Sequence, residues 1–352
     1  MKLLVQPDDG VKELIEAIDD AKKSIEIMIF RFDHKEVERA LMDAMKRGVA
    51  VQALIAFTNR GGERKLRDLE MRLLGAGAVV ARTDNDLARY HGKYMIIDRR
   101  KLYVLAFNFT KSDMEKSRSF GISTTDTDLI QEAVKLFTSD CTRQACAVHS
   151  DALVVSPANS RECLASFLGG AKKQLLIYDL EISDPEMLKI LKARVDAGIE
   201  VRVVGFAKSH PAGMQVRFSH PLRLHARAIV RDGSSIFVGS QSLRRLELDL
   251  RREVGVIVRD SKIASRMIDI FEADWESAKL VEVPAEKVAK KIAKAVASEI
   301  PPLSTVLEQV ASKDGKKVDL DEEHLEEAVR QAVKAAVRDA VQDVVAGETV
   351  AR

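Results

Sequence analysis

The sequence predicts an α/β fold in which two similar halves follow one another and a helical segment comes last. Two observations support this fold class. Runs of apolar residues long enough for buried strands alternate with stretches of helical periodicity over most of the chain. The pattern then recurs: Ala21-Lys22-Lys23 precedes one apolar run, and Ala171-Lys172-Lys173 precedes another 150 residues later. We expect a first half over residues 1–148, a second half over 149–282 and a helical tail over 283–352.

The first half is expected to alternate helices and strands. Val11, Leu14, Ile15 and Ile18 have helical spacing, and the isoleucine-rich run after them is typical of a strand buried on both faces. Gly48 is a typical end for the next helix. The expected elements are helix 10–22, strand 24–32, helix 35–47, strand 49–57, helix 63–74, strand 78–82, hairpin strands 93–98 and 102–107, strand 118–124 and helix 128–139.

The second half is expected to repeat this order in fewer residues. His225 follows His91 by 134 residues rather than 150, so about 16 residues are missing from the second copy. The helix expected at 63–74 has no counterpart around 209–218, which accounts for the difference. Asp232-Gly233 is a typical hairpin turn. The expected elements are helix 161–171, strand 174–180, helix 185–197, strand 200–206, hairpin strands 227–232 and 235–239, strand 253–258 and helix 262–277.

The tail contains two candidate amphipathic helices, at 285–299 and 322–346, separated by Pro301-Pro302. One interpretation is a dimerisation or membrane-surface element. The other is a helical appendage packed on the body, or a loosely ordered tail. The apolar face of the second helix consists of valine, alanine and one leucine, which bind a membrane surface poorly compared with aromatic or leucine-rich faces. This favours the second interpretation.

Composition excludes several classes of protein. With 56 basic and 54 acidic residues the net charge is +2, which is not typical of a protein dedicated to nucleic acid, although a local basic cleft stays open. Three cysteines without CxxC spacing argue against a disulfide framework and a zinc site. No signal peptide is apparent at the first residues, and no apolar run approaches the roughly 18 residues of a membrane span. We expect a cytoplasmic protein without metal or other cofactor, whose peripheral membrane contact and oligomeric state stay open.

One short motif occurs in both halves. His91 is followed by Lys93 and, five residues after the lysine, by Asp98; the second half repeats this arrangement. Each copy leads into a hairpin whose second strand ends in small polar residues. The second copy consists of His225, Arg227 and Asp232; the strand-end residues are Asn108 in the first half and Ser240 and Ser242 in the second.

These residue types suit phosphoryl chemistry. Residues two apart on a strand share a face, so each histidine is paired with a cation. An imidazole can act as nucleophile, base or acid near neutral pH, and a cation beside it can hold a phosphate oxygen. Asn108, Ser240 and Ser242 are expected to donate hydrogen bonds to phosphoryl oxygens. Two histidines on opposite sides of one phosphorus would permit a two-step displacement through a phosphohistidine.

The doubled motif resembles that of the phospholipase D superfamily, HxK(x)4D followed by a Gly- or Ser-rich strand end and then a carboxylate. The resemblance covers roughly residues 8–280, with Gly239-Ser240-Gln241-Ser242 and Glu253 as the later elements of the second copy. It implies two α/β/α halves related by a pseudo-twofold axis, an active site between them and no metal. It also implies that the acidic residue of one half orients the histidine of the other. Glu253 would then hold His91, the expected nucleophile.

Two positions depart from the family pattern. Arg227 stands where lysine is expected, and arginine is bulkier but keeps the charge. Ser119 follows His91 by the same 28 residues that separate Glu253 from His225, and it has no carboxylate. His225 is therefore expected to face Ser119 and to act as the general acid and base. Asp98 and Asp232 are expected to fix the hairpins rather than touch substrate.

The best interpretation is a phosphodiesterase or phosphatidyltransferase whose substrate is a phospholipid, because the charge balance does not favour a polyanion. A metal-independent nuclease is the first alternative, since basic residues near both sites could follow a phosphate backbone. These are Arg60, Arg64, Lys65 and Arg67 near the first site and Arg244, Arg245, Arg251 and Arg252 near the second. The second alternative is a catalytically degenerate phosphate-binding module, motivated by Arg227 and Ser119.

Overall fold

The computed structural model describes residues 1–57, 63–207, 210–218 and 221–278. The chain divides into two compact units, 1–280 and 281–352, and everything below concerns the first. The helices predicted for the tail, and Arg60, lie outside the described residues. Within the described ranges, no helix is long and apolar enough to cross a membrane.

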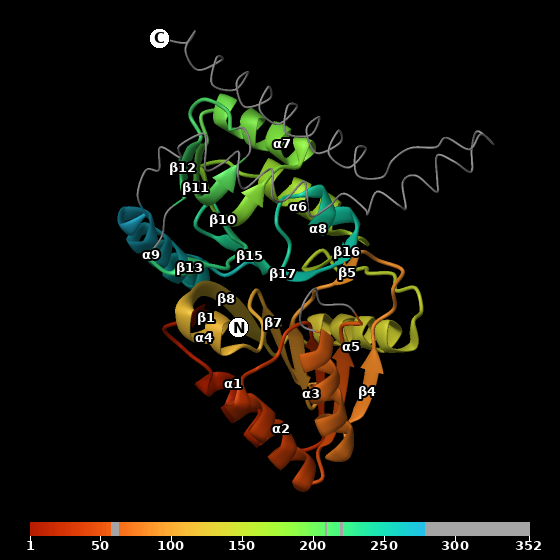
Figure 1. Cartoon of the computed structure of the whole chain (residues 1–352). Coiled ribbons are helices and arrows are strands. Elements are labelled where there is room, and N and C mark those ends of the chain that lie inside the picture. The colour runs from red at the N-terminus through yellow and green to blue at the C-terminus, as the bar shows by residue number, and fades with distance from the viewer. Residues whose placement is uncertain (58–62, 208–209, 219–220, 279–352) are drawn as a thin grey trace, which may run out of the picture. The chain divides into compact units, whose positions relative to one another are not determined.

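The first half is built on a mixed sheet (Figure 1). Strands β2, β3 and β4 are parallel, while β6, β7, β8 and β1 continue the sheet antiparallel. The spatial order is β1 (Lys2–Gln6), β8 (Ser117–Thr124), β7 (Lys101–Leu105), β6 (Tyr94–Ile97), β2 (Ser24–Ile29), β3 (Ala50–Ile55) and β4 (Val79–Arg82). Its helices are α1 (Lys12–Asp20), α2 (Lys35–Lys46), α3 (Glu63–Gly75), α4 (Lys111–Lys116) and α5 (Thr127–Thr142).

The second half repeats this plan with a second mixed sheet. Its spatial order is β12 (Gln215–Arg217), β11 (Glu200–Ala207), β10 (Gln174–Ile182), β14 (Ala228–Arg231), β15 (Ser235–Gly239), β17 (Val254–Val258) and β9 (Leu153–Val155). Its helices are α6 (Ser160–Gly169), α7 (Pro185–Asp196), α8 (Arg245–Asp249) and α9 (Ser261–Ser277). Over 210–218 there is a short strand and no helix, so the first half's α3 lacks a counterpart there, as predicted. We propose the boundary between the halves at residues 148 and 149.

Local sequence explains where the helices begin. The side chain of Asp126 caps α5 by accepting from the backbone N–H of Leu129 at 3.0 Å, and Asp260 does the same for α9. Asp184 caps α7, whose first residue is Pro185. These caps and the apolar runs account for the close agreement between the predicted and observed elements.

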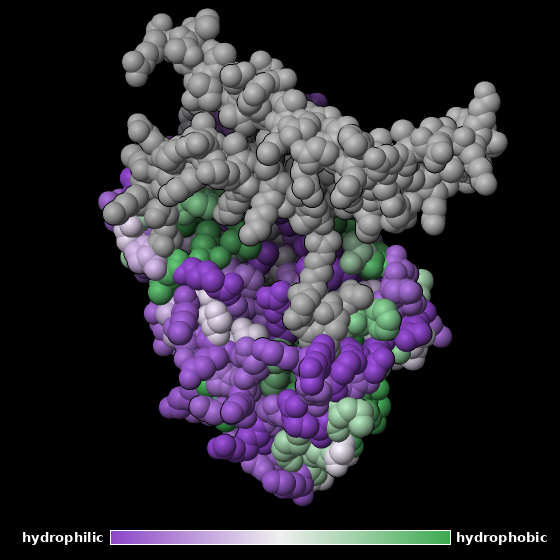
Figure 2. All heavy atoms as spheres, in the orientation of Figure 1, coloured by the Kyte–Doolittle hydropathy of each residue, from purple (hydrophilic) through white to green (hydrophobic). Residues whose placement is uncertain are grey.

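Three apolar cores hold the body together. One lies between the first sheet and α1, α2 and α3, and another between the second sheet and α6 and α7. The central core joins the halves: α5 and α9 pack there with the inner faces of both sheets, through rings such as Phe120, Tyr178 and Phe271. Figure 2 shows that the visible described surface is largely hydrophilic, as expected when the apolar faces are buried in these cores.

Reciprocal contacts confirm the predicted pseudo-twofold relation. The N–H of His91 donates to the carbonyl of Arg252 at 2.7 Å, and the N–H of His225 donates to the carbonyl of Arg118 at 3.0 Å. The two arginines make reciprocal ion pairs as well, Arg118 with Asp274 and Arg252 with Asp140. Short strands cross between the halves at the same places: β5 (Arg89–Tyr90) pairs with β16 (Arg251–Arg252), and β13 (Arg223–Leu224) pairs with β8.

Candidate active site

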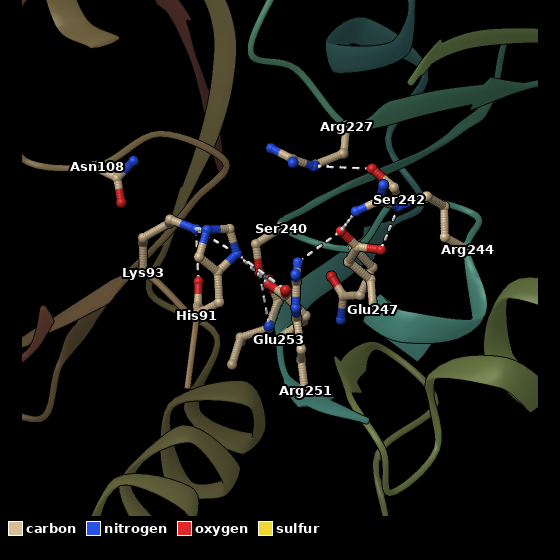
Figure 3. A network of polar contacts seen from close by, with 12 residues as sticks. His91, Lys93, Asn108, Arg227, Ser240, Ser242, Arg244, Glu247, Arg251 and Glu253 are labelled. Atoms are coloured by element: carbon tan, nitrogen blue, oxygen red, sulfur yellow. Dashed lines mark hydrogen bonds and ion pairs between the residues drawn. The ribbon is translucent and has the colours of Figure 1, made fainter. Parts of the chain in front are cut away.

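His91 belongs to the first half but is held by a carboxylate of the second (Figure 3). Its Nδ1 lies 2.9 and 3.0 Å from the two carboxylate oxygens of Glu253, which is completely buried. Burial raises the pKa of Glu253, and the charge of Lys93 opposes this shift and favours the ionised form. An ionised carboxylate only accepts, so Nδ1 beside it carries the proton and Nε2 the lone pair. The ring also contacts the edge of Phe30, with centroids 4.4 Å apart. Nε2 is therefore the reactive nitrogen.

Lys93 is fully buried beside the same ring. Its ammonium donates to the His91 carbonyl at 2.6 Å and lies 3.0 Å from both ring nitrogens. Nδ1 cannot accept from it while donating to Glu253, so only Nε2 can. A phosphate oxygen that binds Lys93 would replace this bond and free the Nε2 lone pair. Burial lowers the pKa of Lys93 well below its ordinary value, while Glu253 acts in the opposite direction. Lys93 and His91 thus present donor and lone pair to the same space.

His225 lies at the equivalent place in the second half, after β13, but its surroundings differ from the expected ones. The Ser119 hydroxyl does contact this residue, donating to its backbone carbonyl at 2.7 Å rather than to the ring. The ring has a carboxylate beside it: Nδ1 lies 3.3 Å from Oδ2 of Asp113. The expectation that His225 would have no carboxylate is therefore wrong, because α4 of the first half brings one in.

The two histidines and two cations form one electrostatic site. Burial, followed by the charges of Lys93 and Arg227, lowers the pKa of His91 well below its ordinary value. Burial and then Arg227 lower the pKa of His225 in the same way; Lys93 adds to this and Asp113 opposes it. Arg227 is 6% exposed and its Nε donates to the Ser242 hydroxyl at 3.2 Å. Figure 3 shows Lys93 and His91 of the first half facing Arg227 and Glu253 of the second.

The strand-end residues mainly support other groups of the site. The amide nitrogen of Asn108 and its backbone N–H donate to Asp113 at 2.7 and 2.8 Å. The Ser240 hydroxyl bonds both the N–H and the carbonyl of Val254, next to Glu253. Ser242 accepts from Arg227. Direct contact of these three with substrate therefore stays a prediction, and the structure gives each a positioning contact.

Asp98 and Asp232 lie in the hairpin turns. Both have positive φ, 52° and 55°. Asp98 accepts from the N–H groups of Lys22, Lys23 and Ser24, and Asp232 from those of Lys172, Lys173 and Gln174. Burial opposes ionisation, but these backbone bonds hold the pKa of both carboxyls below the ordinary value. Each aspartate ties its hairpin to the start of the central strand, and we propose a purely structural role.

Three acidic residues of the site region were not singled out from the sequence. Asp113 pairs with His225, and Glu247 pairs with Arg244 and Arg251. Asp179 is buried within β10, where it accepts from the N–H groups of Leu243 and Glu181. A signal for two of them was present: Asp113 and Glu247 are 134 residues apart, the spacing of the two histidines.

Most arginines near the second histidine are engaged within the protein. Arg244 bonds Glu181 and Glu247, Arg251 bonds Glu247, and Arg252 bonds Asp140 and the Ser156 carbonyl. Arg245 is exposed, as are Arg64 and Lys65 on α3, while Arg67 pairs with Glu70. In the described part of the chain, the three cysteines form no disulfide and no cluster of three or more His, Cys, Asp or Glu could hold a metal.

Comparison with known proteins agrees with this geometry. The family model described as "Cardiolipin synthase, PLD-like domain" matches residues 14–141 and 206–275, more than half of the chain and both histidine motifs. The chain belongs to the phospholipase D superfamily. The resemblance expected from the doubled motif is thus confirmed, and the chain has the fold of an enzyme superfamily of phosphodiesterases and phosphotransferases.

Individual relatives are distant. A polyphosphate kinase of Vibrio vulnificus (strain YJ016) is 25% identical over 293 residues, 74% of this chain and 41% of its own length. The mitochondrial cardiolipin hydrolase of Mus musculus is 26% identical over 128 residues, 36% of this chain and 56% of its own. The chain thus spans about half the length of these relatives. The structure of phosphatidylserine synthase from Haemophilus influenzae Rd KW20 shares the fold, with a TM-score of 0.61 and 11% identity, covering 84% of this chain and 93% of that one.

Proposed function

We propose that this phospholipase D superfamily member is a phosphodiesterase or phosphatidyltransferase that works through a phosphohistidine at His91. The observation that carries the proposal is the bond between His91 and Glu253 across the two halves, which fixes the tautomer with a lone pair on Nε2. The carboxylate also stabilises the imidazolium character that develops on attack. Lys93 and Arg227 supply positive charge for the non-bridging oxygens of the phosphodiester.

The reaction consists of two displacements. Nε2 of His91 attacks phosphorus, the N–P bond forms, and the P–O bond to the leaving alcohol breaks while His225 donates a proton to that oxygen. His225, now neutral, takes a proton from water or an acceptor alcohol, whose oxygen attacks the phosphohistidine and returns the bonding pair to His91. Burial and then the nearby cations lower the pKa of His225. The negative charge of the bound phosphodiester acts in the opposite direction and favours the protonated form that the first step needs.

Phospholipid is the preferred substrate. The matching family model and one relative carry names that refer to cardiolipin, and most arginines beside the second histidine are used by internal carboxylates. The nuclease alternative is supported by the exposed Arg64, Lys65 and Arg245. The longer match to a polyphosphate kinase supports transfer to a phosphate acceptor as another possibility. The cytoplasmic location expected from the sequence stays a prediction, and peripheral membrane contact stays open.

The degenerate-module alternative has lost part of its basis. It rested on Arg227 and Ser119, but Arg227 keeps a buried cation in the site and Asp113 supplies a carboxylate to His225. Hydrolysis of bis-p-nitrophenyl phosphate in the presence of EDTA tests the proposal. Wild type should turn over repeatedly, whereas His91→Ala should release no p-nitrophenolate and His225→Ala should not proceed beyond the first release. Full activity in both variants would overturn the phosphohistidine mechanism. Liposomes and single-stranded DNA, compared as substrates, then decide between lipid and nucleic acid.

A further inference from the structure

Asp113 is held in a defined place next to His225. It lies on α4, where its backbone N–H donates to the capping hydroxyl of Thr110 at 3.2 Å. Its carboxylate accepts two bonds from Asn108 and an ion pair from Arg223, and it is 4% exposed. Burial opposes its ionisation, but His225, the N–H groups of Asn108 and Arg223 together hold its pKa below the ordinary value. It is therefore an ionised, fixed acceptor.

The Nδ1 nitrogen of His225 needs such an acceptor. It is buried, and no other hydrogen-bond partner for it exists among the described residues. At 3.3 Å from Asp113 its geometry is that of an ion pair rather than an aligned hydrogen bond. A buried N–H without an acceptor costs about 1–3 kcal/mol, so a small rotation of the ring toward Asp113 is favoured.

The internal repeat shows why Asp113 is available. Its counterpart 134 residues later, Glu247, is neutralised by Arg244 and Arg251 and does not serve a histidine. At the positions equivalent to these two arginines the first half has Thr110 and Ser117. Without those cations, Asp113 forms ion pairs with Arg223 and His225 among the residues that the structure describes.

The two halves thus use different positions of the repeat for the same purpose. In the second half, residue 253 is a glutamate that serves His91, and residue 247 is engaged by arginines. In the first half, the residue equivalent to Glu253 is Ser119, and the residue equivalent to Glu247 is turned toward His225.

We propose that Asp113 is the positioning residue of His225, fixing its Nδ1–H so that Nε2 faces the phosphodiester, and that Arg223 weakens this support. The inference rests on the proposed function for the role of His225. Two carboxylate oxygens contact Nδ1 of His91, whereas Asp113 is shared between His225, Asn108 and Arg223. A carboxylate shared in this way stabilises the imidazolium less, which suits a residue that must release its proton to a leaving group.

Two substitutions with opposite effects test the inference. Asp113→Asn keeps the shape and an acceptor for Asn108 but removes the charge, so it should lower the pKa of His225 and relax its tautomer. Arg223→Gln, at a side chain that is 50% exposed, removes the cation that competes for Asp113 and should raise that pKa. Nitrogen-15 NMR of histidine-labelled protein, with the resonance assigned from His225→Gln, measures tautomer and pKa without any need for activity.

Kinetics supply the second readout. p-Nitrophenolate leaves without protonation, whereas an alkoxide needs the acid. Asp113→Asn should therefore slow turnover of an alkyl phosphodiester about 10²-fold or more, while the single-turnover release of p-nitrophenolate changes less than about 10-fold. An unchanged His225 tautomer and pKa in Asp113→Asn would overturn the inference, as would equal losses with both leaving groups. If the wild-type protein hydrolyses no phosphodiester, the proposed function is contradicted, and the NMR experiment still tests the role of Asp113.

Discussion

The Nδ1 atom of His91 and a carboxylate oxygen of Glu253 lie 2.9 Å apart, although 162 residues separate them in the chain. One belongs to each half, so neither half alone contains a complete nucleophile. Each histidine is also tied by its N–H to the backbone of the opposite half. Formation of the active site therefore depends on the packing of α5 and α9 in the central core, not on either sheet by itself.

Removing the charge of Glu253 should impair the chemical step more than substrate binding. Glu253→Gln is close in shape but no longer fixes the Nδ1–H tautomer or stabilises imidazolium, so kcat should fall by roughly 10²- to 10⁴-fold. KM should change little, because Lys93 and Arg227 are untouched. Steady-state kinetics measure both constants. Glu26→Gln, at a buried glutamate paired with Arg99, is the matched control and should keep kcat. A loss confined to KM would contradict the orienting role.

The pH dependence of enzyme phosphorylation should reflect the lowered pKa of His91. The reactive form is neutral, and burial with the nearby cations lowers its pKa below 6.5, so activity should persist into acid below that value. Arg89 is one of those cations, and Arg89→Gln should raise the pKa and move the acidic limb to higher pH. The acidic limb is obtained by measuring the burst rate between pH 4 and 8, at about five buffered pH values per pH unit. Arg100→Gln, at an exposed residue of the hairpin turn, should leave it in place.

The hairpin aspartates should contribute to stability and not to chemistry. Asp98→Ala and Asp232→Ala each leave backbone N–H groups without their carboxylate acceptor, so the free energy of unfolding should fall by about 1–3 kcal/mol in each. The repeat predicts similar losses at the two sites. Urea unfolding measures them, and kcat at a temperature where the variants remain folded should equal that of wild type. A large fall in kcat of folded Asp98→Ala would show that the residue acts in the site.

The sequence predicted the regular elements well because apolar runs and helix caps are local signals. It missed two short helices, α4 and α8, and the short strands β5, β12, β13 and β16. It also missed β1 and β9, whose five and three residues form edges of their sheets. Such short segments carry too little periodicity to be distinguished from a connecting loop. Pairing with β8 and β17, which is a tertiary contact, is what makes them strands.

The site was predicted less completely than the fold. The two histidines, their cations and Glu253 followed from the doubled motif, and the structure brings them together. Asp113 did not, because its role depends on how α4 presents one side chain to the other half. The first half has Thr110 and Ser117 where the second half has Arg244 and Arg251. This difference decides which carboxylate is available to a histidine. Only the folded repeat shows that these positions lie beside Asp113 and Glu247.

Asp179 should make stability depend on pH in the opposite direction to the buried histidines. Burial, only partly offset by bonds from Leu243 and Glu181, raises its pKa to about 7. The folded state then binds this proton more tightly than the unfolded state, so its contribution is full below the unfolded pKa and is lost as pH rises through about 7. The histidines, with lowered pKa values, lose stability as pH falls below 6.5. Asp179→Asn removes the titration; it keeps an acceptor oxygen for one of the two N–H groups, which bond different oxygens of Asp179, and the loss of the other bond is the same at every pH. The free energy of unfolding of the variant minus that of wild type should therefore increase by roughly 1–3 kcal/mol from pH 5.5 to pH 8. Urea unfolding at both pH values measures this difference. If variant and wild type differ in free energy of unfolding by the same amount at both pH values, Asp179 titrates in the folded protein as it does in the unfolded chain.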